Sequence, residues 1–398
     1  MSHANRPLEG VRVIDFGQLT AGANTSAMLA DLGADVIKIE SANRMDLFRL
    51  SASDRESGWW DRSAQFHFTN RNKRGITLDL KAPEGRKIAF DLLSHSDIVV
   101  ENFRRGVLDG LGLGYADVEA VNPRVIFAAV TSQGDSGPNR LHRTYGSTLD
   151  ALGGLAAITG YSDGEPILSG VDVNYPDQVV SLAAVGFIIA ALREARLSGK
   201  GALLDIPQRE IVSFLIGEEI VAASADSNYN PSPTGNASAG VLLQETFRGN
   251  DKRWFALTVC NVADAERLRE LVGWEEDLTP AIEIWCARRT SSQAVSELRT
   301  AGLSAAVVMN GKDLIDAPDI IGGSLVWGAD GTLVKGMPYS FEELPFTIER
   351  PAPALGAHTR EVLTKILGLD DVHLAALAES GVTNADPLTT YSERTPNA

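Results

Sequence analysis

The feature that most constrains the fold is an apolar segment, residues 179–192, in which Ser181 is the only polar residue. Because it is apolar on all faces, it predicts a helix buried on every side, and it is too short and too flanked by charge to span a membrane. Asp177 follows Pro176 at the start of this helix, where free N–H groups and the helix dipole favour an anion. Asp177 is therefore either a simple helix cap or an accessible, partly desolvated nucleophile, and Asp172 is the rival carboxylate.

Apolar strand-like runs alternate with helix-like segments through the first half of the chain. Such alternation predicts an α/β fold with a Rossmann-like parallel sheet and right-handed crossovers. The first strand-to-helix turn, residues 17–23, lacks the GxGxxG fingerprint of dinucleotide-binding proteins. Residues 41–72 carry no periodic pattern and are expected to form a long irregular loop. The strands are expected at residues 11–16, 35–40, 75–81, 97–103, 123–130 and 201–206.

The composition changes near residue 223. Residues 224–240 are rich in Ser, Asn, Pro and Gly, and a strand and three helices are expected beyond them. We therefore predict three segments: 1–223, the first part of a large Rossmann-like domain; 224–329, a smaller α+β domain; and 330–398, a return linker and the C-terminal part of the large domain.

Charge and cysteine content exclude several classes of protein. The net charge of −16 over 398 residues argues against nucleic-acid and anionic-membrane partners. The two cysteines, Cys260 and Cys286, form no metal-binding motif, so disulfides and structural metals are not expected. No apolar segment follows Met1, which favours a cytoplasmic location.

Basic residues gather around the expected strand ends of this acidic chain. They form either a solvated surface or a set of phosphate contacts, since anionic ligands bind at the carboxyl ends of parallel strands. The basic residues are Arg71, Lys73, Arg74, Lys81, Arg104 and Arg105.

Several segments together resemble the family III CoA-transferases, a group typified by formyl-CoA transferase that includes carnitine CoA-transferase and, more distantly, α-methylacyl-CoA racemase. Their order and spacing cover nearly the whole chain. The segments are LEGVRVIDF (8–16), GADVIKIE (33–40), NKRGITLDLKAPEGRK (72–87), ENFRRGVLDGLGL (101–113), NPRVIFAAV (122–130) and PAPALGAHTREVL (351–363).

The resemblance implies a catalytic aspartate before a buried helix, and the spacing fits Asp177 and rejects Asp172. Two basic residues that the family has are replaced here by Ser41 and Gly110, for which Arg44, Arg104 or Arg105 could substitute. The implied CoA-binding positions are Thr20, Ala21, the 78–81 segment with Leu78 and Lys81, Asn102, Phe103, Arg104, Arg143 and Tyr145.

The implied reaction moves CoA from an acyl-CoA to a small carboxylic acid through an aspartyl anhydride and an aspartyl-CoA thioester, with acyl-CoA as substrate and neither a permanent cofactor nor a metal. Backbone N–H groups, from Gln178 or a glycine loop, are expected to stabilise the oxyanions. The resemblance also implies an interlocked homodimer and a mobile lid at residues 235–240. The sequence does not identify the two acids: Arg49, Trp59 and Arg140 could select a dicarboxylate such as succinate or oxalate, or be structural.

Two other functions stay open at this point. A racemase would need a His and Asp pair, but Thr144-Tyr145-Gly146 occupies the position of the histidine motif, and tyrosine is a poor base at neutral pH. A non-catalytic acyl-CoA-binding protein is the second alternative.

Overall fold

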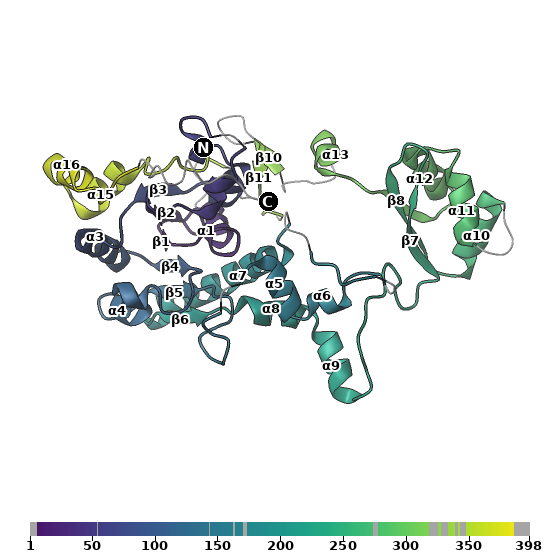
Figure 1. Cartoon of the computed structure of the whole chain (residues 1–398), viewed down its shortest axis with the longest axis horizontal. Helices are drawn as coiled ribbons and strands as arrows, with labels where there is room; N and C mark the ends of the chain where they lie inside the picture. The colour runs from purple at the N-terminus through teal and green to yellow at the C-terminus, as the bar shows by residue number, and fades with distance from the viewer. Residues whose placement is uncertain are drawn as a thin grey trace. The chain divides into compact units, whose positions relative to one another are not determined.

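The computed structural model describes residues 6–53, 55–142, 144–161, 164–169, 173–273, 278–317, 325–327, 333–338, 341–342 and 348–385 (Figure 1). The chain divides into two compact units. The first comprises Met1–Leu155, Ser169–Gly217 and Gly322–Ala398, and the second Ala156–Leu168 and Glu218–Ile321. The three segment boundaries expected from composition stay a prediction.

A six-stranded parallel sheet forms the centre of the first unit, with the strand order β3-β2-β1-β4-β5-β6. The order reverses between β1 and β4, which is the point where ligands bind in open α/β sheets. The predicted α/β fold with a Rossmann-like sheet is confirmed. The strands are β1 Arg12–Asp15, β2 Asp35–Glu40, β3 Arg74–Thr77, β4 Ile98–Glu101, β5 Ile126–Ala129 and β6 Ala202–Asp205.

Alternate strand residues supply two separate cores. Val13 and Val100 pack with α1 (Ala21–Asp31) and α7 (Tyr175–Ser198) on one face of the sheet. Ile14 and Val99 face the opposite side, where four other helices cover them. This period of two is what a strand buried on both faces requires. The helices of the second face are α3 Pro83–Ser94, α4 Tyr115–Glu119, α15 Thr359–Leu367 and α16 Asp371–Glu379.

The apolar helix α7 is not buried on every side, so that prediction is wrong. Val180, Ala184 and Ile188 face the core, while Leu182 and Phe187 are 47% and 52% exposed. The sheet covers only one face of α7. The sequence could not show which residues lie on that face, because the helix is apolar all round. At 24 residues, α7 is also the one helix in the described part of the chain that is long and apolar enough to cross a membrane, which corrects the expectation that the segment is too short; core helices pass the same test.

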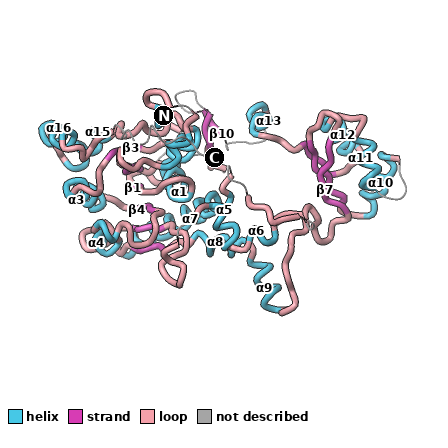
Figure 2. The backbone as a smooth tube through the Cα atoms, viewed as in Figure 1, coloured by secondary structure: helices cyan, strands magenta, loops and turns pink. Residues whose placement is uncertain are grey.

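A three-stranded antiparallel sheet, β7-β8-β9, forms the second unit together with α10, α11 and α12 (Figure 2). Phe247, Phe255 and Leu257 lead its separate core, into which Leu268, Ile282 and Leu298 project from the three helices. The smaller α+β domain is therefore confirmed as a fold. Its elements are β7 Leu243–Arg248, β8 Trp254–Val259, β9 Ser304–Val307, α10 Val262–Val272, α11 Leu278–Cys286, α12 Ser291–Thr300 and α13 Gly311–Asp316.

The stretch expected to be irregular, 41–72, contains a helix, α2 Ala64–Asn70. Its N-cap Ser63 accepts a hydrogen bond from Phe66 N–H. Serine at this position is a helix-start signal, and the prediction overlooked it because the surrounding aromatic residues show no helical period. The remaining elements are η1 Leu47–Ser51, η2 Trp59–Asp61, η3 Asp109–Leu111, α5 Gly146–Leu152, α6 Leu155–Ile158, α8 Gln208–Leu215, α9 Gly217–Ala225, β10 Leu325–Trp327 and β11 Leu333–Lys335.

Candidate active site

Asp177 lies in the first turn of α7. The N-cap of this helix is Asn174, which adopts the left-handed conformation (φ 44°, ψ 54°) and makes no side-chain cap. Asp177 is thus not the N-cap itself, although it shares the positive end of the helix dipole. Pro176, the residue before it, has no N–H and suits the first turn of a helix.

The Asp177 carboxylate is partly buried, and no cation among the described residues pairs with it. Burial is the main cause that raises its pKa to about 6, and the negative charge of Asp150 adds to the rise, while its own backbone N–H opposes it. A carboxylate with this pKa is still about nine-tenths ionised at pH 7. It is therefore a desolvated and reactive anion at neutral pH.

Gly146, at the start of α5, lies directly against the Asp177 carboxylate. A Cβ atom at this position would come within 2.8 Å of Asp177 Oδ2 and 3.0 Å of Asn174 Oδ1. Asp150 lies one turn further along α5 and is buried. Its Oδ2 accepts hydrogen bonds from Ser169 N–H (2.9 Å) and Ser169 O–H (2.6 Å), whereas its Oδ1 has no hydrogen-bond partner among the described residues. The start of α5 therefore forms one wall beside Asp177.

Helix α1 supports α7 from the other side. Ser181 Oγ donates to the carbonyl of Ala21 at 3.1 Å, and the Gln178 side chain accepts from Asn24 Nδ2 at 3.1 Å. Gln178 N–H donates to Asn174 O at 3.2 Å, so it is not a free oxyanion donor, contrary to our expectation. These contacts bring Ala21, predicted to bind CoA, next to α7, the helix that begins with Asp177 in its first turn.

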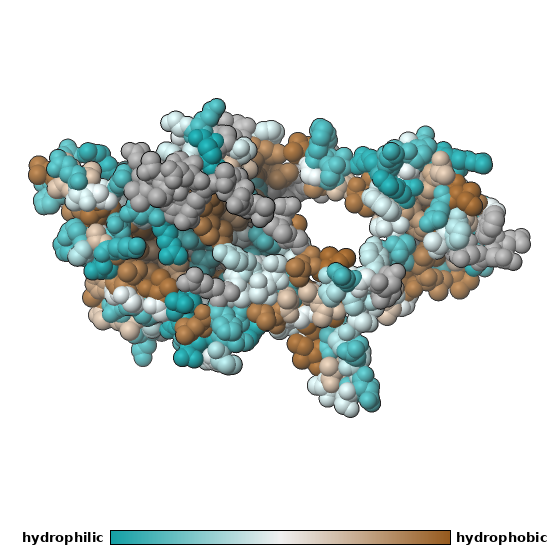
Figure 3. Space-filling model, viewed as in Figure 1, coloured by the Kyte–Doolittle hydropathy of each residue, from teal (hydrophilic) through white to brown (hydrophobic). Residues whose placement is uncertain are grey.

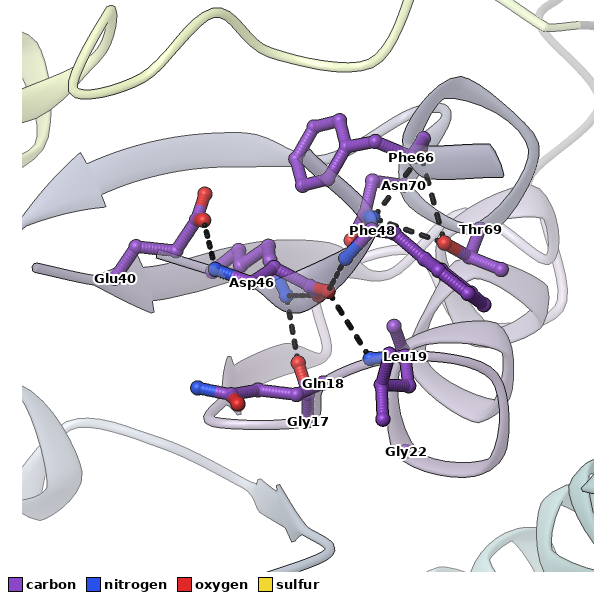
Figure 4. Close-up of polar contacts among 12 residues, drawn as sticks. Gly17, Gln18, Leu19, Gly22, Glu40, Asp46, Phe48, Phe66, Thr69 and Asn70 are labelled. Carbon is purple, nitrogen blue, oxygen red and sulfur yellow. Dashed lines mark hydrogen bonds and ion pairs between the residues drawn. The ribbon is translucent and has the colours of Figure 1, made fainter. Parts of the chain in front are cut away.

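Buried side chains hold the backbone of the first strand-to-helix turn in place. Asp46 Oδ1 accepts from Leu19 N–H at 3.1 Å (Figure 4). The Asn102 amide both accepts from Gln18 N–H and donates to Gln18 O at 2.8 Å. Leu19 has a positive φ of 57°, a strained conformation that these bonds maintain. Asn102 therefore shapes the turn with its side chain, rather than leaving its amide open to a ligand.

The other predicted CoA-binding positions fall into three groups. Thr20 is the buried N-cap of α1, and Leu78 is fully buried in the core, so only its main chain can face a ligand. Phe103 is partly buried and packs against the same core. Lys81 and Arg104 are exposed after β3 and β4, and Tyr145 is exposed beside Gly146. No contact among described residues joins Lys81 or Arg104 to Asp177. Arg143 lies outside the described residues, as does the rival Asp172.

Three members of the basic cluster are structural, so neither role that the sequence left open for them, solvated surface or phosphate contact, holds. Arg71 pairs with Asp31, Lys73 Nζ with Asp15 at 2.8 Å, and Arg74 with Asp35 at 2.7 Å. All three cations are buried, and a buried charge needs such a partner. Arg105 is also paired, with Asp135 and Asp109.

Two of the residues considered for selecting a dicarboxylate are structural too. Arg49 is fully buried, pairs with Glu40 at 2.7 Å and with Asp61, and stacks on Phe66 at 3.6 Å. Trp59 is buried in a small core of its own. Arg140 is exposed and stays available for such a role.

A family model described as CoA-transferase family III matches residues 8–359. Together with the Rossmann-like sheet and the aspartate at the start of α7, this match shows that the chain belongs to that family and is a CoA-transferase. The chain is similar to succinyl-CoA–D-citramalate CoA-transferase of Chloroflexus aurantiacus, with 31% identity over 94% of this chain and 97% of the relative. It is also similar to human succinyl-CoA:glutarate CoA-transferase, with 27% identity over 95% and 90%.

A solved structure agrees with this assignment. The crystal structure of a CAIB/BAIF family protein from Brucella suis superposes with a TM-score of 0.84 at 28% identity, over 91% of this chain and all of that one.

Two elements of the site were missed by reasoning from sequence. They are Asp150, beside Asp177, and Lys335, whose Nζ donates to the Gln178 side chain at 2.9 Å. Neither residue lies in a motif, and the residues that they contact are distant in sequence, so no local pattern could have revealed them. Among the described residues, no group of three or more His, Cys, Asp or Glu side chains is placed to hold a metal ion.

Proposed function

We propose that this enzyme transfers CoA from an acyl-CoA to a carboxylic acid with Asp177 as the covalent carrier. The observation that carries the proposal is the state of this carboxylate: it is partly buried, it pairs with no cation in the described part of the chain, and its pKa is raised to about 6. Desolvation makes the carboxylate a better nucleophile, and the helix N-terminus helps to keep it ionised.

The proposed reaction has four balanced steps. The Asp177 carboxylate attacks the thioester carbonyl and the C–S bond breaks, giving an aspartyl–acyl mixed anhydride and CoA thiolate. The thiolate attacks the aspartyl carbonyl, which yields an aspartyl-CoA thioester and releases the donor acid. The acceptor carboxylate then attacks this thioester to form a second anhydride, and the thiolate finally takes the acceptor acyl group.

For substrates, we propose succinyl-CoA as donor and a short dicarboxylic acid as acceptor. The support is that the relatives from Chloroflexus aurantiacus and human are named for succinyl-CoA together with citramalate and glutarate. Coenzyme A enters and leaves as part of the substrates. We expect it to lie along the predicted positions Thr20, Ala21, Lys81, Phe103, Arg104, Arg143 and Tyr145, at the carboxyl edge of the sheet.

The test is to trap the carrier. Purified enzyme is incubated with succinyl-CoA and then hydroxylamine, and the peptide containing Asp177 is examined by mass spectrometry for an aspartyl hydroxamate. We expect the adduct in wild type and in Asp172→Ala, and neither adduct nor transfer in Asp177→Asn. Normal turnover in folded Asp177→Asn would refute the proposal. Deuterium uptake at the α-carbon without CoA exchange would point to a racemase instead.

We also propose a homodimer of interlocked chains in the cytoplasm. Its support is the outward half of α7, where Leu182, Phe187 and Ile189 are exposed in the single chain. Phe214 on α8 is exposed as well. A surface with several large exposed apolar side chains is typical of sites that bind another protein. The lid expected at residues 235–240 stays part of this proposal.

A further inference from the structure

The residue after the nucleophile, Gln178, is held by two side chains from distant parts of the chain. Its Oε1 accepts hydrogen bonds from Asn24 Nδ2 in α1 at 3.1 Å and from Lys335 Nζ in β11 at 2.9 Å. One carboxamide oxygen thus ties the first turn of α7 to two other elements of the same unit.

The Lys335 ammonium has an unusual set of neighbours. Besides Gln178 it lies over the ring of Phe68, 4.5 Å from the centroid, and no carboxylate in the described part of the chain is within ion-pair distance. The charged groups that act on it are Arg71 and Asp31, which pair with each other. A half-buried ammonium without a carboxylate partner is costly to desolvate, so its hydrogen bond to Gln178 is the polar contact that offsets this cost.

The first turn of α7 needs support from outside the helix. Its N-cap Asn174 is in the left-handed conformation and forms no side-chain cap, and Pro176 donates no hydrogen bond. The next side-chain contact to α1, from Ser181 to the Ala21 carbonyl, comes one turn later. Among the described residues, Gln178 therefore provides the side-chain brace at the level of Asp177.

We propose that Lys335 is a positioning residue for the nucleophile: with Asn24 it grips Gln178 and so holds Asp177 in the geometry that attacks the thioester. This inference rests on the proposed role of Asp177. Reaction rates fall steeply when the attacking atom is displaced by about 1 Å, which costs on the order of 100-fold. Loss of the grip therefore slows acylation rather than weakening the binding of acyl-CoA.

The grip depends on pH. Burial, with a contribution from Arg71, lowers the pKa of Lys335 to about 8, whereas Asp31 acts in the opposite direction. As pH rises through about 8, the ammonium becomes a neutral amine and its charge-assisted bond to Gln178 weakens. The rate of acylation is therefore expected to decline on the alkaline side of pH 8.

The experiment measures single-turnover acylation of the full-length enzyme by succinyl-CoA, followed by mass spectrometry across pH 6–10. In Lys335→Met we expect an acylation rate at pH 7 lower by about tenfold, a KM for succinyl-CoA within twofold of wild type, and no alkaline limb near pH 8. Lys335→Arg, which stays charged, should retain most of the rate and lose the limb. The matched control is Lys312→Met, since Lys312 is an exposed lysine in the second unit.

A second variant keeps the test decisive if Lys335→Met folds poorly. Gln178→Glu supplies a carboxylate to the same ammonium, which raises the pKa of Lys335, so the alkaline limb should move to higher pH. Wild-type rate and an unchanged alkaline limb in both variants would overturn the inference. If wild type itself forms no adduct on Asp177, the proposed function has failed; if only positioning is wrong, Lys335→Met forms the adduct at the wild-type rate.

Discussion

Gly146 determines how much room the Asp177 carboxylate has. We expect Gly146→Ala to lower kcat by roughly 10- to 100-fold, because the new Cβ would lie only 2.8 Å from Asp177 Oδ2 and would push the carboxylate out of line. Steady-state kinetics measure the effect. The matched control is Gly311→Ala, where nothing lies within 4 Å of the added atom. Unchanged kcat in Gly146→Ala would show that the carboxylate can move aside at no cost.

Asp150 acts on the nucleophile through its charge. Its negative charge contributes to the raised pKa of Asp177, about 6, so activity should fall as pH drops through that value and Asp177 takes up a proton. Asp150→Asn removes the charge and favours ionised Asp177, which moves the acid limb of kcat/KM to lower pH. The pH profile of Asp316→Asn, a change at an exposed site, is the control. An acid limb that stays in place would rule out this coupling.

Buried charged side chains hold the turn between β1 and α1 in place. Asp46 links it to one strand, β2. It accepts from Leu19 N–H, and its own N–H donates to Glu40 at 3.0 Å (Figure 4). It also accepts from Lys38 Nζ at 3.0 Å. Lys38 in turn donates to the Gly17 carbonyl at 2.6 Å. The turn is therefore rigid before any ligand arrives, which lowers the entropy cost of binding.

Asp46→Asn tests this arrangement. It leaves the Lys38 ammonium buried without its carboxylate, which typically costs about 3–5 kcal/mol of unfolding free energy. We expect denaturant unfolding to show this loss and the KM for acyl-CoA to rise, because the new amide NH2 faces the Lys38 ammonium and displaces the side chain that holds Leu19 at its positive φ. Removal of one partner of the exposed Lys312–Asp316 pair should change stability by less than about 1 kcal/mol. A wild-type KM in Asp46→Asn would show that the conformation of this turn does not affect the binding of acyl-CoA.

At the scale of the whole molecule, the exposed apolar residues need a covering partner. Phe187 on α7 and Phe214 on α8 are 52% and 82% exposed, and Figure 3 shows hydrophobic residues on the surface around α9, where Ile220 and Val221 are exposed. These helices are neighbours along the chain. A second copy of the chain is the partner that the proposed homodimer supplies.

Phe187→Asp is expected to weaken the dimer, because a charge in an apolar interface is desolvated without a partner. Light scattering coupled to gel filtration should then give a monomer fraction that grows on dilution. Val372→Asp, at a residue of α16 that is 77% exposed, should leave the mass unchanged. A monomeric mass for the wild-type enzyme would refute the dimer itself.

The sequence by itself determined the alternation that gives the parallel sheet, the smaller α+β domain and the position of Asp177 before an apolar helix. These are local properties, since hydrophobic period and helix-start signals are set by residues near one another in the chain. Segment order was sufficient to identify the family, because the matching segments run from residue 8 to residue 363.

Only the tertiary structure decided what the charged residues do. Arg71, Lys73 and Arg74 looked like phosphate contacts but are buried beside Asp31, Asp15 and Asp35. Likewise, the contact of Gly146 with Asp177 and the grip of Lys335 on Gln178 join residues 31 and 157 positions apart. A sequence pattern records neither burial nor which opposite charge comes close after folding, and these two quantities determine whether a charge serves stability or the ligand.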